Sequence, residues 1–159
     1  MRDTRKCLAV IRVRGVSDIF QEIDDTLKLL HLTRNCHATL IDDRPSHLGM
    51  LSKAKDYLTW GEVSREGIIL LLKKRGRLEG NRKLTDAYLQ EIGYDTIEDL
   101  AEAVHKMKAE YHKLHGVKPI FRLRPPKKGY GGKVKRSFAS GGVTGDRGQA
   151  INDLIKRMA

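Results

Sequence analysis

The chain is poor in cysteine, with only Cys7 and Cys36 among its 159 residues. No Cys-x-x-Cys pair exists, so the sequence offers neither a disulfide framework nor a cysteine-rich zinc motif. We expect both residues to be reduced thiols in the core of a cytosolic protein.

Long apolar runs are also missing. No stretch is apolar over the roughly 18 residues that a membrane helix needs. The apolar run near the N-terminus ends at Arg12, which is too short for a signal peptide. We therefore expect a soluble chain that stays in the compartment where it is made and has no membrane contact.

Acidic residues are in the minority: 20 Asp and Glu stand against 31 Lys and Arg, for a net charge of +11. The excess lies in two runs, because residues 118–147 carry nine cations and one anion, and residues 73–83 carry six cations and one anion. One charged run is usually a solvated face. Two basic surfaces on a nearly neutral body favour a nucleic acid partner. If about six to ten cations meet phosphates, affinity should fall by about 10³–10⁵ between 50 and 200 mM salt.

The strands predict an α/β (α+β) fold with a three-stranded sheet in β-α-β-α-β order. Residues 7–14 (CLAVIRVR) are largely apolar, as expected of a central strand. Residues 37–41 (HATLI) form the second strand, and about 119–123 (PIFRL) is the only later candidate. We expect the helices on one face of the sheet and a right-handed first crossover.

Two helices are predicted beside these strands. Asp18 caps the first, with Gln21 in the reciprocal position, and Ser46 caps the second. Apolar residues recur on one face of each helix. These are Ile19, Ile23, Leu27 and Leu30 in the first, and Leu48, Leu51, Ala54 and Leu58 in the second.

Residues 1–124 are predicted as the core, with a helical insertion at about 62–115 that forms a layer within the fold. Its helices are expected at Ser64–Lys74, at Thr85–Ile92 and at Ile97–Leu114, the last capped by Thr96 with Asp99 in the box position.

Residues 125–159 are predicted as a basic, extended arm rich in glycine and proline. Seven glycines lie between Gly129 and Gly148, so the arm should be mobile until it meets its partner. Tyr130 and Phe138 either stack on unpaired bases or tuck back onto the core. A short amphipathic helix at 149–158 docks the end of the arm.

Enzyme and metal chemistry find little support. Residues 129–133 (GYGGK) suggest a phosphate-binding loop, but Val134 stands where Ser or Thr would hold magnesium. The spacing of His31, Cys36, His37 and His47 fits no usual zinc site. No nucleophile, base and oxyanion site are assembled. We expect no catalysis, no metal, no cofactor and no small-molecule substrate.

Several motifs occur in the order typical of one family. Residues 30–35 (LHLTRN) and 45–55 (PSHLGMLSKAK) are similar to its shared core, while 59–62 (TWGE), 74–76 (KRG) and 84–86 (LTD) are similar to its helical insertion. Residues 141–147 (GGVTGDR) and 151–158 (INDLIKRM) are similar to its C-terminal signature. The chain thus resembles, nearly end to end, the ribosomal protein L thirty family (L seven in the eukaryotic cytosol), above all its archaeal branch.

The resemblance implies a fold related to ferredoxin-like sheets and a non-catalytic, structural role in the large (50S) ribosomal subunit of the cytoplasm. One copy per ribosome would bind 23S rRNA near the central protuberance and 5S rRNA, beside neighbouring large-subunit proteins, and stabilise the folded RNA during assembly and translation. The implied RNA contacts of the core are Arg34, Arg44, Lys53 and Lys55. Those of the insertion are Lys73, Lys74, Arg75, Arg77, Arg82 and Lys83. Those of the last strand and arm are Arg122, Arg124, Lys127, Lys128, Tyr130, Lys133, Lys135, Arg136, Phe138 and Arg147.

Two other functions fit the composition. A free RNA or DNA regulator would exist largely unbound in cell extracts, whereas a ribosomal protein would co-sediment stoichiometrically with the large subunit. A small enzyme would be stabilised against heat by nucleotides or metals.

Overall fold

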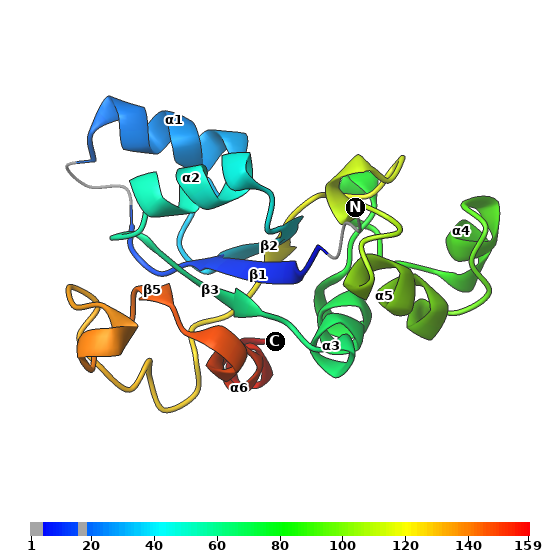
Figure 1. The fold of residues 1–159 in the computed structure, drawn as a ribbon. Helices are drawn as coiled ribbons and strands as arrows, with labels where there is room; N and C mark the ends of the chain where they lie inside the picture. Colours follow the sequence, from blue (N-terminus) through cyan, green and yellow to red (C-terminus); the bar gives the residue numbers. More distant parts are fainter. Residues whose placement is uncertain (1–4, 16–18) are drawn as a thin grey trace.

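The computed structural model describes residues 5–15 and 19–159, and the strands of these residues form one five-stranded sheet (Figure 1). β1 (Cys7–Arg12) lies at its centre, between β2 (His37–Asp42) and β3 (Leu58–Glu62), and pairs antiparallel with both. β4 (Phe121–Arg122) pairs antiparallel with β2, and β5 (Gly145–Asp146) pairs parallel with β3. The central position predicted for the first strand is confirmed, and so is a strand within 119–123.

The prediction of three strands is wrong, chiefly because β3 was not foreseen. Leu58 continues the spacing of Leu51 and Ala54, which made it look helical, but α2 (Pro45–Lys53) ends before it. β3 instead pairs with the second edge of β1, whose backbone groups would otherwise be buried without partners. The crossover prediction also fails, because β1 and β2 are antiparallel and the handedness rule concerns parallel strands.

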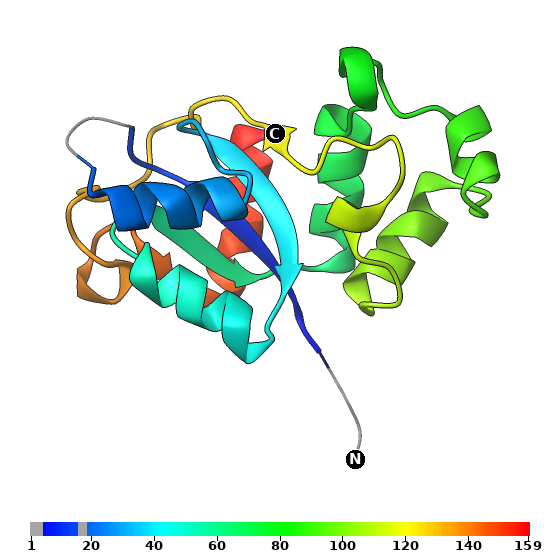
Figure 2. The ribbon, with the colours of Figure 1, turned by 90° about the horizontal axis from the view of Figure 1, so that it is seen from above.

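α1 (Gln21–Leu29) and α2 cover one face of the sheet (Figures 1 and 2). Leu8 and Val10 of β1 pack there with Leu27 and Leu51 in one buried cluster. Ile19, Ile23, Leu30 and Ala54 pack in this same cluster, whereas Leu48 is exposed. Most of the apolar face predicted for each helix is therefore confirmed.

Neither N-cap predicted for these two helices is confirmed. Asp18 lies outside the described residues, and Phe20 occupies the N-cap position of α1 with no side-chain hydrogen bond to the helix. α2 begins two residues earlier than predicted, with Pro45 in its first turn and Arg44 at the N-cap position. The cap predicted at Ser46 is therefore wrong, and the fixed φ of Pro45 starts the helix instead.

The opposite face of the sheet is covered by α6 (Ile151–Met158), as Figure 2 shows. Cys7, Ala9 and Ile11, the β1 residues that alternate with Leu8 and Val10, pack on this side with the buried residues of α6 and the insertion. Because successive side chains of a strand point to opposite faces, one central strand supplies both clusters. The two helices of the predicted β-α-β-α order, α1 and α2, therefore share one face as expected, and α6 covers the other.

The insertion places α3 (Arg65–Arg75), α4 (Asp86–Glu91) and α5 (Ile97–His105) together beside the sheet (Figure 2). The three predicted starts are confirmed, since the Ser64, Thr85 and Thr96 hydroxyls accept hydrogen bonds from backbone N–H groups at the starts of their helices. α5, however, ends at His105 rather than Leu114. Met107 has a φ of 57°, which is incompatible with a continuing right-handed helix.

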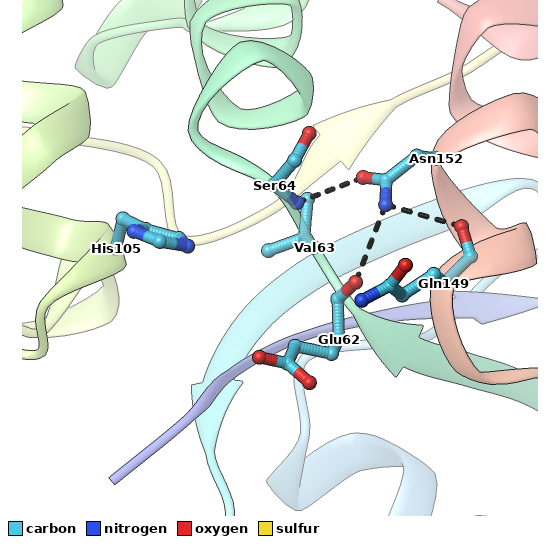
Figure 3. Close-up of a pocket in the computed structure, with 6 residues that line it drawn as sticks. All are labelled: Glu62, Val63, Ser64, His105, Gln149 and Asn152. Atoms are coloured by element: carbon cyan, nitrogen blue, oxygen red, sulfur yellow. Dashed lines mark hydrogen bonds between the residues drawn. The ribbon is translucent and has the colours of Figure 1, made fainter. Parts of the chain in front are cut away.

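The side chain of Asn152 links α6 by hydrogen bonds to the connection between β3 and α3 (Figure 3). Its Oδ1 accepts a hydrogen bond from the Ser64 N–H at 2.8 Å, while its Nδ2 donates to the carbonyls of Glu62 and Gln149 at 3.3 and 3.1 Å. One amide side chain thus joins segments about ninety positions apart in the sequence.

The arm folds back onto the protein and is not extended as predicted. The Arg124 and Lys127 N–H groups donate to the carbonyls of Met158 and Arg157, and the Arg147 N–H donates to Trp60 at 2.8 Å. Val143 is fully buried. The predicted terminal helix is confirmed as α6. Among the described residues, no helix has both the length and the apolar character needed to cross a bilayer.

Candidate nucleic-acid interface

Some of the predicted RNA-contacting cations are already paired with carboxylates. Lys73 contacts Glu98 at 2.8 Å, and Lys53 lies 3.8 Å from Glu22. Exposed pairs of this kind contribute little stability and can be exchanged for a stronger partner. These two lysines remain accessible at the surface.

Arg44 is held more firmly, in a network around Asp42. Its Nε lies 2.8 Å and its Nη2 2.7 Å from the Asp42 carboxylate, and it also pairs with Glu110. The Nδ1 of His47 lies 2.7 Å from the same carboxylate. Burial alone would raise the pKa of Asp42, but the hydrogen bonds from Arg44 and His47 hold it at about 2. Arg44 thus joins the β2–α2 turn to the segment after α5.

A hollow at the edge of the sheet is lined by cations that have no carboxylate partner in the described part of the chain. We name it the His37 hollow, and it is lined by Thr33, Arg34, His37, Ile120 and Arg122. His37 of β2 and Arg122 of β4 are direct partners in the strand register, so their side chains are neighbours. Arg34, in the loop before β2, completes the positive wall.

A second hollow lies beside it. We name it the Arg75 hollow, and it is lined by Arg75, Arg77, Asn81 and Arg122. Backbone contacts bring the insertion to this edge, since the Lys118 N–H donates to the Arg77 carbonyl at 3.0 Å and Leu78 bridges Val117. Arg122 therefore borders both hollows.

The charge at these hollows is uncompensated. Within the described part of the chain, neither Arg34 nor Arg75 nor Arg122 forms an ion pair. In the same part of the chain, the side chain of Arg77 donates a hydrogen bond to the neighbouring carbonyl of Gly76 and forms no ion pair. Because like charges repel, such a cluster is best satisfied by an added anion.

His37 is the buried member of this group, only 9% exposed, and its Nδ1 has no hydrogen-bond partner among the described residues. Burial lowers its pKa, and so does repulsion from Arg122, Arg34 and Arg12. Sequence reasoning considered His37 only as a metal ligand, and its pairing with Arg122 depends on a strand register that the sequence does not reveal.

The arm presents a second group of free cations. Between residues 125 and 147, the exposed cations without an ion pair in the described residues are Lys127, Lys128, Lys133, Lys135 and Arg136. The Arg136 carbonyl accepts hydrogen bonds from the N–H groups of Val143 and Thr144, at 2.8 and 3.1 Å. This loop is folded by its main chain, so its cationic side chains are left free.

The three remaining arm residues predicted to meet RNA lie differently. Arg147 is 6% exposed, and its guanidinium donates to the Thr59 hydroxyl and the Val143 carbonyl at 2.8 and 2.7 Å. Phe138 stacks on this guanidinium at 4.8 Å, and half-buried Tyr130 packs with its hydroxyl 3.8 Å from Cys36 Sγ. The buried guanidinium of Arg147 therefore joins the arm to β3 by hydrogen bonds. Tyr130 therefore takes the tucked alternative and packs against the core, whereas Phe138 stays 39% exposed.

The other predicted contacts are exposed: Lys55, Lys74, Arg82, Lys83 and Arg124. They form no ion pair within residues 5–15 and 19–159, although Arg82 Nε donates to the Glu79 carbonyl at 3.4 Å. In the same part of the chain, no three His, Cys, Asp or Glu side chains converge as a metal site requires.

Comparison with known proteins gives consistent relatives. A family model described as Ribosomal protein L30p/L7e matches residues 8–58, which run from β1 to the start of β3. Similar over most of their length are three archaeal proteins named large ribosomal subunit protein uL30. The one from Methanopyrus kandleri is 49% identical over 92% of this chain and 99% of its own. Those from Methanosphaera stadtmanae and Nanoarchaeum equitans are each 48% identical over 94% of this chain, and over 98% and 96% of their own.

Alignments that cover 92–94% of this chain include the helical insertion and the arm, which lie outside the segment matched by the family model. The chain therefore belongs to the family of the large ribosomal subunit protein uL30.

Proposed function

We propose that this chain is a structural constituent of the large (50S) ribosomal subunit and binds 23S rRNA near the central protuberance and 5S rRNA. One copy per cytoplasmic ribosome would stabilise the folded RNA during assembly and translation, next to neighbouring large-subunit proteins. The sequence division into a core at 1–124, related to ferredoxin-like sheets, and an arm at 125–159 is part of this proposal.

The observation that carries the proposal is the accumulation of unpaired cations at the two hollows and on the arm. Phosphates of an RNA backbone supply the missing anions, and the release of their counterions drives binding. Family membership supports the same reading, because the relatives are named as proteins of the large ribosomal subunit.

The uL30 family consists of structural proteins and not of enzymes. The proposed contacts accordingly position RNA and perform no chemistry on it.

Sucrose-gradient sedimentation with mass spectrometry of the heavy fractions tests the proposal. The chain should co-sediment with large subunits at one copy per particle and remain there at the salt concentration of the cell. A chain found mainly in the unbound fraction would contradict the proposal and favour the free regulator.

The salt dependence of binding to a large-subunit rRNA transcript is the second test. Affinity should fall by about 10³–10⁵ between 50 and 200 mM salt if about six to ten phosphates are contacted. A nearly flat dependence would mean that the cations do not carry the binding.

A further inference from the structure

We infer that one RNA backbone crosses the edge strand β4 at Arg122, with one phosphate in the His37 hollow and a neighbouring phosphate in the Arg75 hollow. This inference rests on the proposed function and adds a place and a path for one strand of the RNA.

The shared border is the first step of the argument. Arg122 lines both hollows, and it is the only residue common to them. A guanidinium has five N–H donors in a planar fork, so it can face two acceptors on different sides. One arginine between two hollows therefore suits two neighbouring phosphates of one strand.

The composition of each hollow is the second step. Arg34 faces one hollow, Arg75 and Arg77 face the other, and Thr33 and Asn81 add neutral donors at the rims. No Asp or Glu of residues 5–15 and 19–159 lines either hollow. Arginine forks match phosphate oxygens in geometry and charge, whereas an acidic peptide would also need space for its side chains.

The position of β4 is the third step. It is an edge strand, paired on one side with β2, and α3 ends at Arg75 close to it. The last turn of α3 contains Lys73, Lys74 and Arg75, where the negative end of the helix dipole favours cations. A strand of RNA leaving the Arg75 hollow would meet further positive charge.

Binding to large-subunit rRNA tests the inference, with Arg122→Gln as the main variant. If Arg122 contacts one or two phosphates of a single strand, the slope of log affinity against log salt should become shallower by about 0.7–1.4. Arg122→Lys keeps the charge and should keep most of the slope. Lys156→Gln is the matched control, because Lys156 is an exposed cation on α6 outside both hollows, and its slope should stay as in the wild type.

NMR of the His37 imidazole provides a readout that does not depend on affinity. The charged groups around it are Arg122 on β4, Arg34 before β2 and Arg12 on β1. A bound phosphate would offset their repulsion, so RNA should raise the pKa of His37, and less so in Arg122→Gln. Inorganic phosphate at matched ionic strength should raise it less than RNA, because it lacks the second contact.

The outcomes separate the inference from the proposed function. If the wild type binds rRNA and Arg122→Gln binds with the same slope, the path across β4 is wrong although the ribosomal role stands. If inorganic phosphate moves the His37 signals and RNA does not, the hollow holds a free anion and the inference is also wrong. If the wild type binds no rRNA, the proposed function itself fails. Circular dichroism confirms that each variant is folded.

Discussion

Asp42 is a carboxylate kept ionised in a nearly inaccessible place. It is 1% exposed, and Arg44 and His47 hold its pKa at about 2, although burial acts in the opposite direction. Arg5 adds a contact at 3.4 Å to its Oδ2. Removing one partner of a buried pair leaves the other charge uncompensated, so the network should matter for stability.

We expect Asp42→Ala to lower the free energy of unfolding at neutral pH by about 3 kcal/mol. The folded-state pKa lies below the ordinary value of 3.8, so the contribution is present above about pH 4 and is lost as the pH falls through about 2. Urea unfolding from pH 7 to pH 2 measures both effects. Asp56→Asn, an exposed control, should change stability by less than about 0.5 kcal/mol. An equal pH dependence in Asp42→Ala and wild type would contradict this account.

Gly61 and Gly49 allow a matched test of close packing. A Cβ on Gly61 of β3 would lie 2.0 Å from the Gly148 carbonyl oxygen, whereas a Cβ on Gly49 of α2 would meet nothing within 4 Å. Gly61→Ala should therefore destabilise the protein by about 1–3 kcal/mol, because two backbones must separate. Gly49→Ala should stabilise it by about 0.5–1 kcal/mol through helix propensity. Thermal unfolding compares them, and a Gly61→Ala variant as stable as the wild type would mean that β3 and the Gly148 turn are not in close contact.

Among the helices and strands, the sequence predicts the ones that depend on local signals. The strands at Cys7 and His37, the helix starts at Ser64 and Thr85, and the cap at Thr96 follow from local composition and spacing. β3 was missed because its apolar residue Leu58 continues the helical spacing of α2, and only pairing with β1 makes the segment a strand. Tertiary context outweighs local preference in such cases.

The same distinction holds for the interface. The two basic runs could be read from the sequence, and the unpaired cations of the arm lie where the charge map predicted. The tight folding of the arm could not be read, because it depends on the burial of Val143 and on the hydrogen bond from Arg147 to Thr59 of β3, far along the chain. The hollows depend likewise on the register between β2 and β4.

The exposed cations of the arm should carry much of the salt-dependent affinity for rRNA. Neutralising Lys127, Lys128, Lys133, Lys135 and Arg136 to Gln together should make the salt slope shallower by about four, if each meets one phosphate. Stability should change little, because the loop is folded by main-chain hydrogen bonds. Filter binding over a salt series measures the slope.

A control set removes the same charge elsewhere. It consists of Lys6, Lys28, Lys106, Lys108 and Lys113, four of which pair with carboxylates. Neutralising this control set should change the slope of log affinity against log salt much less than neutralising the arm cations does. If both sets had equal effects, net charge alone and not the arm would govern binding.

For the molecule as a whole, charge and apolar surface are arranged separately. The unpaired cations lie at one edge of the sheet and on the arm, while the apolar side chains form two clusters, one on each face. Neutralising the cations should therefore affect RNA binding, and truncating the apolar residues should affect stability. Each function of the surface can be tested without disturbing the core.

The alternation along β1 has a consequence for how the protein tolerates change. Leu27 and Leu154 belong to different clusters, on opposite faces of the sheet. Leu27→Ala and Leu154→Ala should each cost about 2–5 kcal/mol, and the double variant should lose their sum within about 0.5 kcal/mol. Guanidinium unfolding of the four proteins measures the coupling, and a larger deviation would mean that strain passes through β1. Additive behaviour would allow relatives to repack one side of the sheet over evolutionary time without compensating substitutions on the other.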